Sequence, residues 1–128
     1  MKPKGAMMTI NKLTSVHTNE HTKAMFVQEA AGFDWDQGNR DKCQKHGVSV
    51  DALESAFHES MAIFPDPAHS QGEERFIAIG KTDAGRNVFI AFTLRQQGGE
   101  TRIRPISARY MHPKEVDYYE TAIAKTGD

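Results

Sequence analysis

Residues 73–109 read EERFIAIGKTDAGRNVFIAFTLRQQGGETRIRPISAR. Three short runs in this stretch are rich in β-branched and aromatic residues, which are typical of strands. The runs are 73–80, 87–94 and 101–109. The segments between them contain glycine, which supplies the backbone geometry of turns. The sequence therefore predicts an antiparallel meander of three strands, and the last strand carries several arginines.

Helix signals flank this meander. Asp36 is placed to cap a helix over 37–46, and Ser49 is placed to cap a second helix. Residues 61–64 form a short strand candidate, and Pro113 suits the first turn of a closing helix. The predicted fold class is therefore α+β, a small twisted antiparallel sheet with two N-terminal helices and one C-terminal helix.

The composition bounds the domain organisation. A chain of 128 residues with net charge −1 suits one globular domain, which we place at 32–124. Residues 1–31 are mostly polar and form an extension, either disordered or helical in part from Thr22 to Ala31. An alternative for this extension is an arm that docks on a partner or on a second copy in a homodimer.

Charge and cysteine content narrow the class of function. Net charge −1 gives no overall attraction to nucleic acid, so any such role needs a local basic patch. The single cysteine, Cys43, fits a reducing compartment such as the cytoplasm, and we interpret it as an inert buried thiol. No apolar run approaches the ~20 residues of a membrane helix, so no membrane role is expected.

Pro105 lies inside the last predicted strand, where proline implies an edge or a bulge. A single bulged residue at Pro105 would place one set of side chains toward the core, namely Thr101, Ile103, Ile106 and Ala108. The opposite face would then carry Arg102, Arg104, Ser107 and Arg109. This register predicts a concentrated basic face on a nearly neutral protein.

Several motifs, taken in order, resemble one protein family. They are FDWD at 33–36 with Asn39, KHGVS at 45–49, FPDP at 64–67, GEERFIAIG at 72–80, GR at 85–86 and IRPISAR at 103–109. Their order and spacing are similar to those of the BrnT family of bacterial type II toxins, over residues 33–119. The resemblance implies a RelE-like fold and ribonuclease activity. It also implies neutralisation by a BrnA antitoxin, whose ribbon-helix-helix part binds operator DNA.

The segment after Arg109 departs from that family. Typical members have a strongly basic segment there, whereas this chain has Lys114 among Tyr110, Met111, Glu115, Val116 and Asp117. A surface with fewer cations binds RNA more weakly. The departure therefore keeps open an alternative, a non-catalytic binding module of the same fold.

RNA can be cleaved without a metal or cofactor, because its own 2′-hydroxyl attacks the neighbouring phosphate. The protein must move protons and stabilise charge on the phosphoryl oxygens. Arg75 and Arg109 are candidates for charge stabilisation, since a guanidinium binds phosphate through two donors. His46, beside Lys45, is a candidate for proton transfer, and Glu74 is a candidate base. The expected RNA-binding residues are Arg102, Arg104, Ser107 and Lys114.

Each candidate also has a simpler interpretation. His46 could only stabilise a helix end, and Glu74 could belong to a solvated loop. His69 and Glu73, joined by His112, could instead form the metal site of a metal-dependent hydrolase, although their spacing is irregular. The favoured interpretation is an enzyme that acts on RNA and has no metal site and no cofactor.

Overall fold

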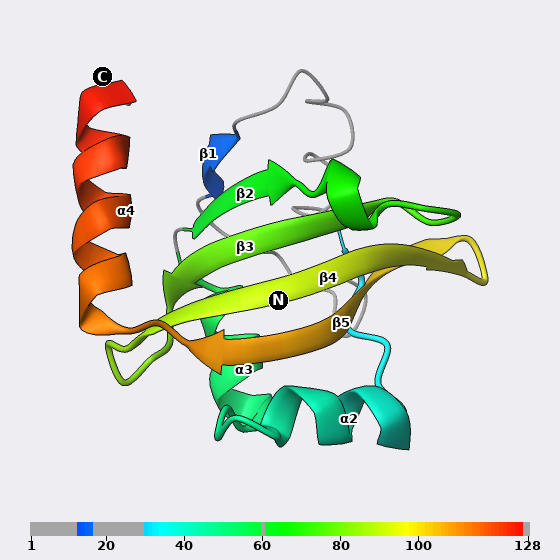
Figure 1. Ribbon diagram of the computed structural model, residues 1–128. Helices are drawn as coiled ribbons and strands as arrows, with labels where there is room; N and C mark the ends of the chain where they lie inside the picture. The colour runs from blue at the N-terminus through cyan, green and yellow to red at the C-terminus, as the bar shows by residue number, and fades with distance from the viewer. Residues whose placement is uncertain (1–12, 17–29, 60, 127–128) are drawn as a thin grey trace, which may run out of the picture.

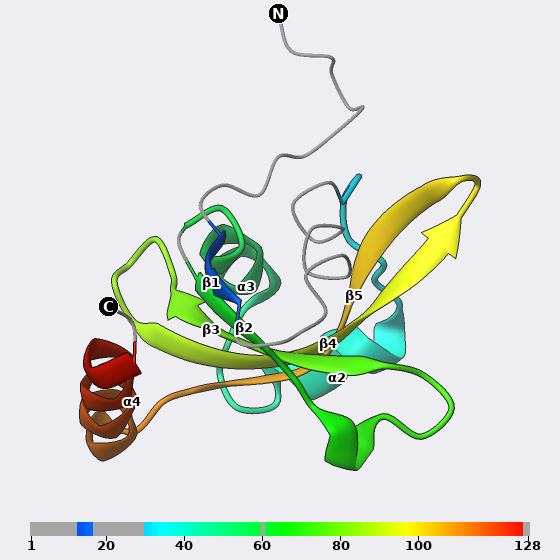
Figure 2. The same cartoon turned by 90° about the horizontal axis from the view of Figure 1, so that it is seen from above.

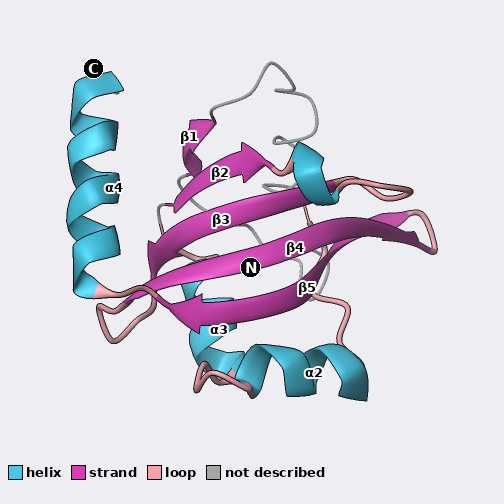
Figure 3. Ribbon diagram, in the orientation of Figure 1, coloured by secondary structure: helices cyan, strands magenta, loops and turns pink. Residues whose placement is uncertain are grey.

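The computed structural model describes residues 13–16, 30–59 and 61–126. At its centre is a five-stranded sheet in the order β1-β2-β3-β4-β5 (Figures 1 and 3). The strands are β1 Leu13–Val16, β2 Met61–Pro65, β3 Arg75–Lys81, β4 Asn87–Gln97 and β5 Glu100–Tyr110. β1 runs parallel to β2, and the other neighbours are antiparallel. The predicted meander is thus confirmed, and β2 extends it.

The helices begin where the capping residues predict. α2 spans Gln37–Gln44, α3 spans Val50–Ala56 and α4 spans Pro113–Thr126, with a short 3₁₀ turn, η1, at Pro67–His69. The Asp36 and Ser49 side chains accept hydrogen bonds from the backbone N–H of Asn39 and Ala52, at 2.9 and 3.0 Å. The α+β class is confirmed. No helix in the described ranges is long and apolar enough to cross a membrane.

The N-terminal extension contributes a strand that the sequence does not predict. β1 adds to the sheet edge beside β2, although its stretch lacks a clear hydrophobic period. The helix predicted from Thr22 lies almost wholly outside the described residues. Ala30, where the described chain resumes, is fully buried in the core. The backbone N–H of Ala31 donates to the Thr101 carbonyl at 2.8 Å, which ties the end of the extension to β5.

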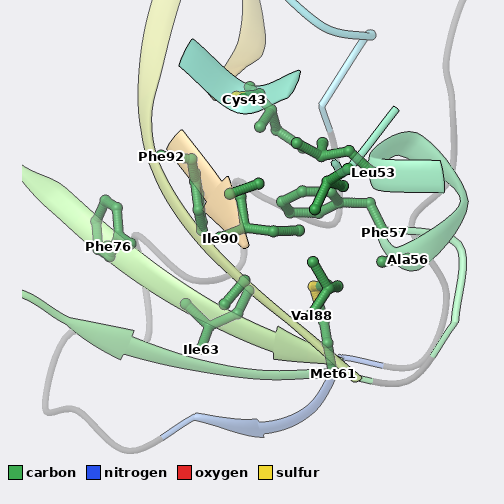
Figure 4. Close-up of a cluster of buried hydrophobic side chains, with 14 of the residues drawn as sticks. Cys43, Leu53, Ala56, Phe57, Met61, Ile63, Phe76, Val88, Ile90 and Phe92 are labelled. Carbon is green, nitrogen blue, oxygen red and sulfur yellow. The ribbon is translucent and has the colours of Figure 1, made fainter. Parts of the chain in front are cut away.

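The helices are distributed unevenly around the sheet. α2 runs along β5, while α3 and α4 lie on opposite sides of the sheet (Figures 1 and 2). The main core forms on the α3 side, where Leu53 and Phe57 meet Val88, Ile90 and Phe92 (Figure 4). The Phe57 ring makes an edge contact with the Phe92 ring, with centroids 5.4 Å apart. We call the face on the other side of the sheet the outer face; Arg75, Thr93 and Arg104 lie across it in one cross-strand row.

Cys43 is buried, as predicted. It is 0% exposed within the core, and burial raises the pKa of its thiol to about 11. The thiol is therefore protonated at neutral pH and unreactive.

β5 contains the predicted bulge, but the bulge is displaced by one residue. Phe92 pairs with Pro105 and Ala91 pairs with Ser107, so Ile106 is the extra residue. Ile103 and Pro105 are buried, whereas Ile106 is half-buried and lies beside Arg104 on the outer face. The prediction that Ile106 shares the core face with Ile103 is therefore wrong, because the Pro105 ring takes the inward position.

Candidate active site

A cleft lies where the N-terminal end of α2 meets the outer face. Its volume is about 670 Å³. The lining residues come from α2 with its capping residue, from three strands and from the loop before β3: Asp36, Gln37, Gly38, Asn39, Lys42, Glu73, Arg75, Thr93, Arg95, Arg104, Pro105 and Ile106. The cleft therefore gathers four cationic side chains and two carboxylates.

Local hydrogen bonds fix the α2 wall of this cleft. Asp36 and Asn39 form a reciprocal capping box, with the Asp36 backbone N–H donating to Asn39 Oδ1 at 2.8 Å. The Asn39 amide, in a side chain only 5% exposed, donates to the carbonyl of Pro105 at 2.8 Å and to that of Asp34 at 3.0 Å. Asn39 thus joins the start of α2 to the bulge of β5.

All three arginines of the predicted basic face are paired with carboxylates. Arg104 contacts Asp36 at 2.7 Å and Asp34 at 3.4 Å, while Arg102 contacts Glu100 at 3.0 Å. The arginines do share the outer face, as the register predicts. Much of their charge is nevertheless neutralised locally, so the face is less basic than its arginine count indicates.

Two cations of the cleft differ from this pattern. The side chains of Arg75 and Lys42 form no ion pair with any residue that the structure describes. Arg75 is half-buried at the start of β3, and Lys42 is exposed on α2. These two groups are therefore available to an anionic ligand without first losing a carboxylate partner.

Arg109 lies near the end of β5 that is remote from the cleft, and its side chain is held by two neighbouring side chains. Its guanidinium makes two hydrogen bonds to Glu115, at 2.8 and 3.0 Å, and lies 4.6 Å from the centroid of the Phe89 ring. Hydrogen bonding from Arg109 lowers the pKa of Glu115 to about 2. Glu115, part of the departure noted in the sequence, therefore occupies the group expected to bind phosphate.

The other predicted site residues are spread over the surface. Lys45 and His46 are exposed just after α2, at the opposite end of this helix from Asp36. Ser107 follows the bulge on β5, and Lys114 is exposed on α4. Of the predicted set, which also includes Glu74, only Arg75 and Arg104 line the cleft.

Three charged residues of the cleft are absent from the set that the sequence predicts to act on RNA, and Glu73 is predicted only as part of the alternative metal site. Arg95 follows Thr93 by two positions, so strand alternation could have placed both on one face. Glu73 precedes Arg75 by two positions and carries the same signal. Lys42 had no such signal, because only the docking of α2 on β5 brings it to the cleft.

The residues proposed for a metal site have other partners. His69 Nδ1 lies 3.0 Å from Asp66, and Glu73 binds Arg95. Within the part of the chain that the structure describes, no three His, Cys, Asp or Glu side chains gather as metal ligands would.

Comparison with known proteins identifies the family. The model of the ribonuclease toxin BrnT, of type II toxin–antitoxin systems, matches residues 35–115, more than half of the chain. No individual curated protein shows significant similarity. The match includes every residue that lines the cleft, as well as the Arg109–Glu115 pair. The chain therefore belongs to the BrnT family of ribonuclease toxins, whose partners are antitoxins.

Proposed function

We propose that this protein is an endoribonuclease that cleaves RNA in the cleft between α2 and the outer face, without a metal ion or cofactor. The observation that supports this most is Arg75, a guanidinium without an ion-pair partner among the described residues, in a cleft shared with Lys42. A group that is already paired must exchange one partner for another before it can bind phosphate. Arg75 interacts electrostatically with Glu73 but, within the part of the chain that the structure describes, has no ion pair to exchange.

The chemistry asked of Arg75 is charge stabilisation. Negative charge accumulates on the non-bridging oxygens as the 2′-oxygen attacks phosphorus, and a guanidinium can donate two hydrogen bonds to them. Lys42 would add a second positive charge. Arg104 would contact the phosphate through whichever of its donors Asp34 and Asp36 leave open.

The remaining predicted residues would contact RNA beyond the scissile phosphate. Arg102 and Ser107 lie on β5 at either side of Arg104, so a strand of RNA following β5 would meet all three. Lys45 and His46 lie at the far end of α2 from the cleft and would contact RNA that continues along this helix. Lys114 and Arg109 would act near α4, Arg109 only after release by Glu115.

The proposed antitoxin is BrnA-like, with a ribbon-helix-helix part that alone contacts operator DNA. Its toxin-binding segment would be acidic and partly helical. The segment would cross Arg102, Arg104 and Arg109 and extend toward Lys45, and the unpaired cations of the cleft would strengthen its binding. The proposed location of the toxin is the cytoplasm, where its RNA substrates are.

The proposed activity is tested with purified protein and a defined RNA. We expect cleavage that a chelator leaves unchanged and that a 2′-O-methyl group at the scissile nucleotide abolishes, because the nucleophile is then blocked. Cleavage lost with chelator would favour the metal-dependent alternative. Binding of the methylated RNA without any cleavage of normal RNA would favour the non-catalytic binding module.

A further inference from the structure

We propose that Glu73 is the general base of this reaction and that Arg95 positions its carboxylate in the cleft beside Arg75. This inference rests on the proposed ribonuclease function. It assigns proton removal to a residue different from His46 and Glu74, the candidates that the sequence suggests.

The geometry singles out Glu73 among the acidic residues. It is one of two carboxylates that line the cleft, and the other, Asp36, caps α2 and binds Arg104. Arg95 Nε donates to Glu73 Oε2 at 2.7 Å, with a weaker contact from Nη2 to Oε1 at 3.4 Å. Because Glu73 and Arg75 both line the cleft, a phosphate on Arg75 would lie close to a carboxylate of fixed orientation.

The proposed step conserves atoms and charge. The Glu73 carboxylate takes the proton of the 2′-hydroxyl as the 2′-oxygen forms a bond to phosphorus and the bond from phosphorus to the 5′-oxygen breaks. The departing 5′-oxygen takes a proton from water. The products are a 2′,3′-cyclic phosphate and a 5′-hydroxyl end, and Glu73 then returns its proton to water.

A simpler interpretation is that the Glu73–Arg95 pair only stabilises the fold. The side chains of Glu73 and Arg95 are 40% and 42% exposed, and ion pairs of such exposure contribute little to stability. Removing the charge of Glu73 should therefore leave the protein folded, so that its effect on the chemistry can be measured separately.

The surroundings of Glu73 set the pH range of its action. The charged groups around it are Arg95 on β4, Arg75 on β3 and Arg104 on β5, and Lys42 and Asp36 reach the same cleft from the α2 side. Hydrogen bonding from Arg95 is the largest cause that lowers the pKa of Glu73 below its ordinary 4.5. A Glu73 base thus stays ionised at pH 5, whereas an imidazole base is protonated below about 6.5.

The test compares Glu73→Gln with Glu100→Gln. Both replace a carboxylate that pairs with an outer-face arginine, but only Glu73 lines the cleft. The single-turnover cleavage rate of Glu73→Gln should fall by ~10²–10⁴ while its affinity for 2′-O-methyl RNA is retained. Glu100→Gln should cleave within a few fold of wild type. A Glu73→Gln rate near that of wild type, or a loss of RNA affinity that accounts for the lower rate, would overturn the proposal.

A pH profile gives a second, independent readout on the wild-type protein. For a Glu73 base, kcat/KM should vary by less than threefold between pH 7 and pH 5. A tenfold or greater decline over this range, with the fold intact, would instead indicate an imidazole base and overturn the assignment. If Arg75→Ala is inactive but Glu73→Gln is active, only the assignment of Glu73 fails. If wild type cleaves no RNA, the proposed function fails as well.

Discussion

Among the arginines of the outer face, the presence of an ion-pair partner determines whether the guanidinium is available to bind phosphate. Arg95, Arg102, Arg104 and Arg109 each bind a carboxylate, whereas Arg75 forms no ion pair within the described part of the chain. The residue type alone predicts five equivalent phosphate ligands. The pairing reduces them to one group that is available at once, and we therefore place the phosphate on Arg75.

The Arg109–Glu115 pair should make stability depend on pH. Glu115 has a folded-state pKa of about 2 against an ordinary 4.5, so its stabilising effect is full above pH 4.5 and is lost as pH falls toward 2. Replacing Glu115 with Gln should therefore reduce the decline of Tm between pH 5 and pH 2.5. Glu120→Gln, on the same helix, is the control and should follow wild type. Parallel Tm curves for all three proteins would contradict this role.

Residue types predicted part of the site. Arg75 and Arg104 were chosen from the sequence and do line the cleft. The carboxylate partners Asp34 and Asp36 could not be predicted, because each lies about seventy positions from Arg104 along the chain. A strand pattern shows which charged residues share a face, but the neutralisation of their charge depends on tertiary contacts.

Asn39 ties α2 to β5 through a buried hydrogen bond to the Pro105 carbonyl. Asn39→Ala removes the donor to the buried Pro105 carbonyl and half of the capping box. Leaving such a carbonyl unpaired should cost about 1–3 kcal/mol in the free energy of unfolding. Gln37→Ala, in the same turn but exposed, should change it by less than about 0.5 kcal/mol. Equal effects in chemical denaturation would show that Asn39 does not anchor the helix.

The bulge in β5 leaves Ile103 and Ile106 buried to different extents. Ile103 is fully buried, so Ile103→Ala should lower the free energy of unfolding by about 2–5 kcal/mol. Ile106 is half-buried on the outer face, so Ile106→Ala should cost about 1 kcal/mol or less. Denaturant titration of the two variants measures this difference. A larger loss for Ile106→Ala would restore the register that the sequence predicts.

The elements themselves were largely predictable because their signals are local. Asp36 and Ser49 cap their helices. Runs rich in β-branched and aromatic residues, separated by turns, form β3, β4 and β5. Two features of the fold could not be predicted from local signals. β1 depends on pairing with β2 rather than on its own pattern, and the register that makes Ile106 the bulged residue depends on how β5 pairs with β4.

For the whole molecule, a net charge of −1 makes RNA binding a local matter. If only Arg75 and Lys42 neutralise phosphates, the logarithm of the affinity for single-stranded RNA should fall with the logarithm of salt concentration with a slope of about −1.4. Lys42→Ala should reduce this slope to about −0.7. Titration of a 2′-O-methyl RNA at several salt concentrations measures both values. A wild-type slope near −4 would mean that further cations, such as Arg102, Arg104, Lys45 and Lys114, also neutralise phosphates.

We place the cleavage of RNA in the cleft that contains Arg75. The most direct test is the single-turnover rate of Arg75→Ala at saturating RNA, compared with Lys81→Ala. Both variants remove one positive charge from β3, but Lys81 ends the strand away from the cleft. We predict a fall of ~10²–10³ for Arg75→Ala and a change of less than threefold for Lys81→Ala. A folded Arg75→Ala protein that cleaves RNA at the wild-type rate would show that cleavage does not occur in this cleft.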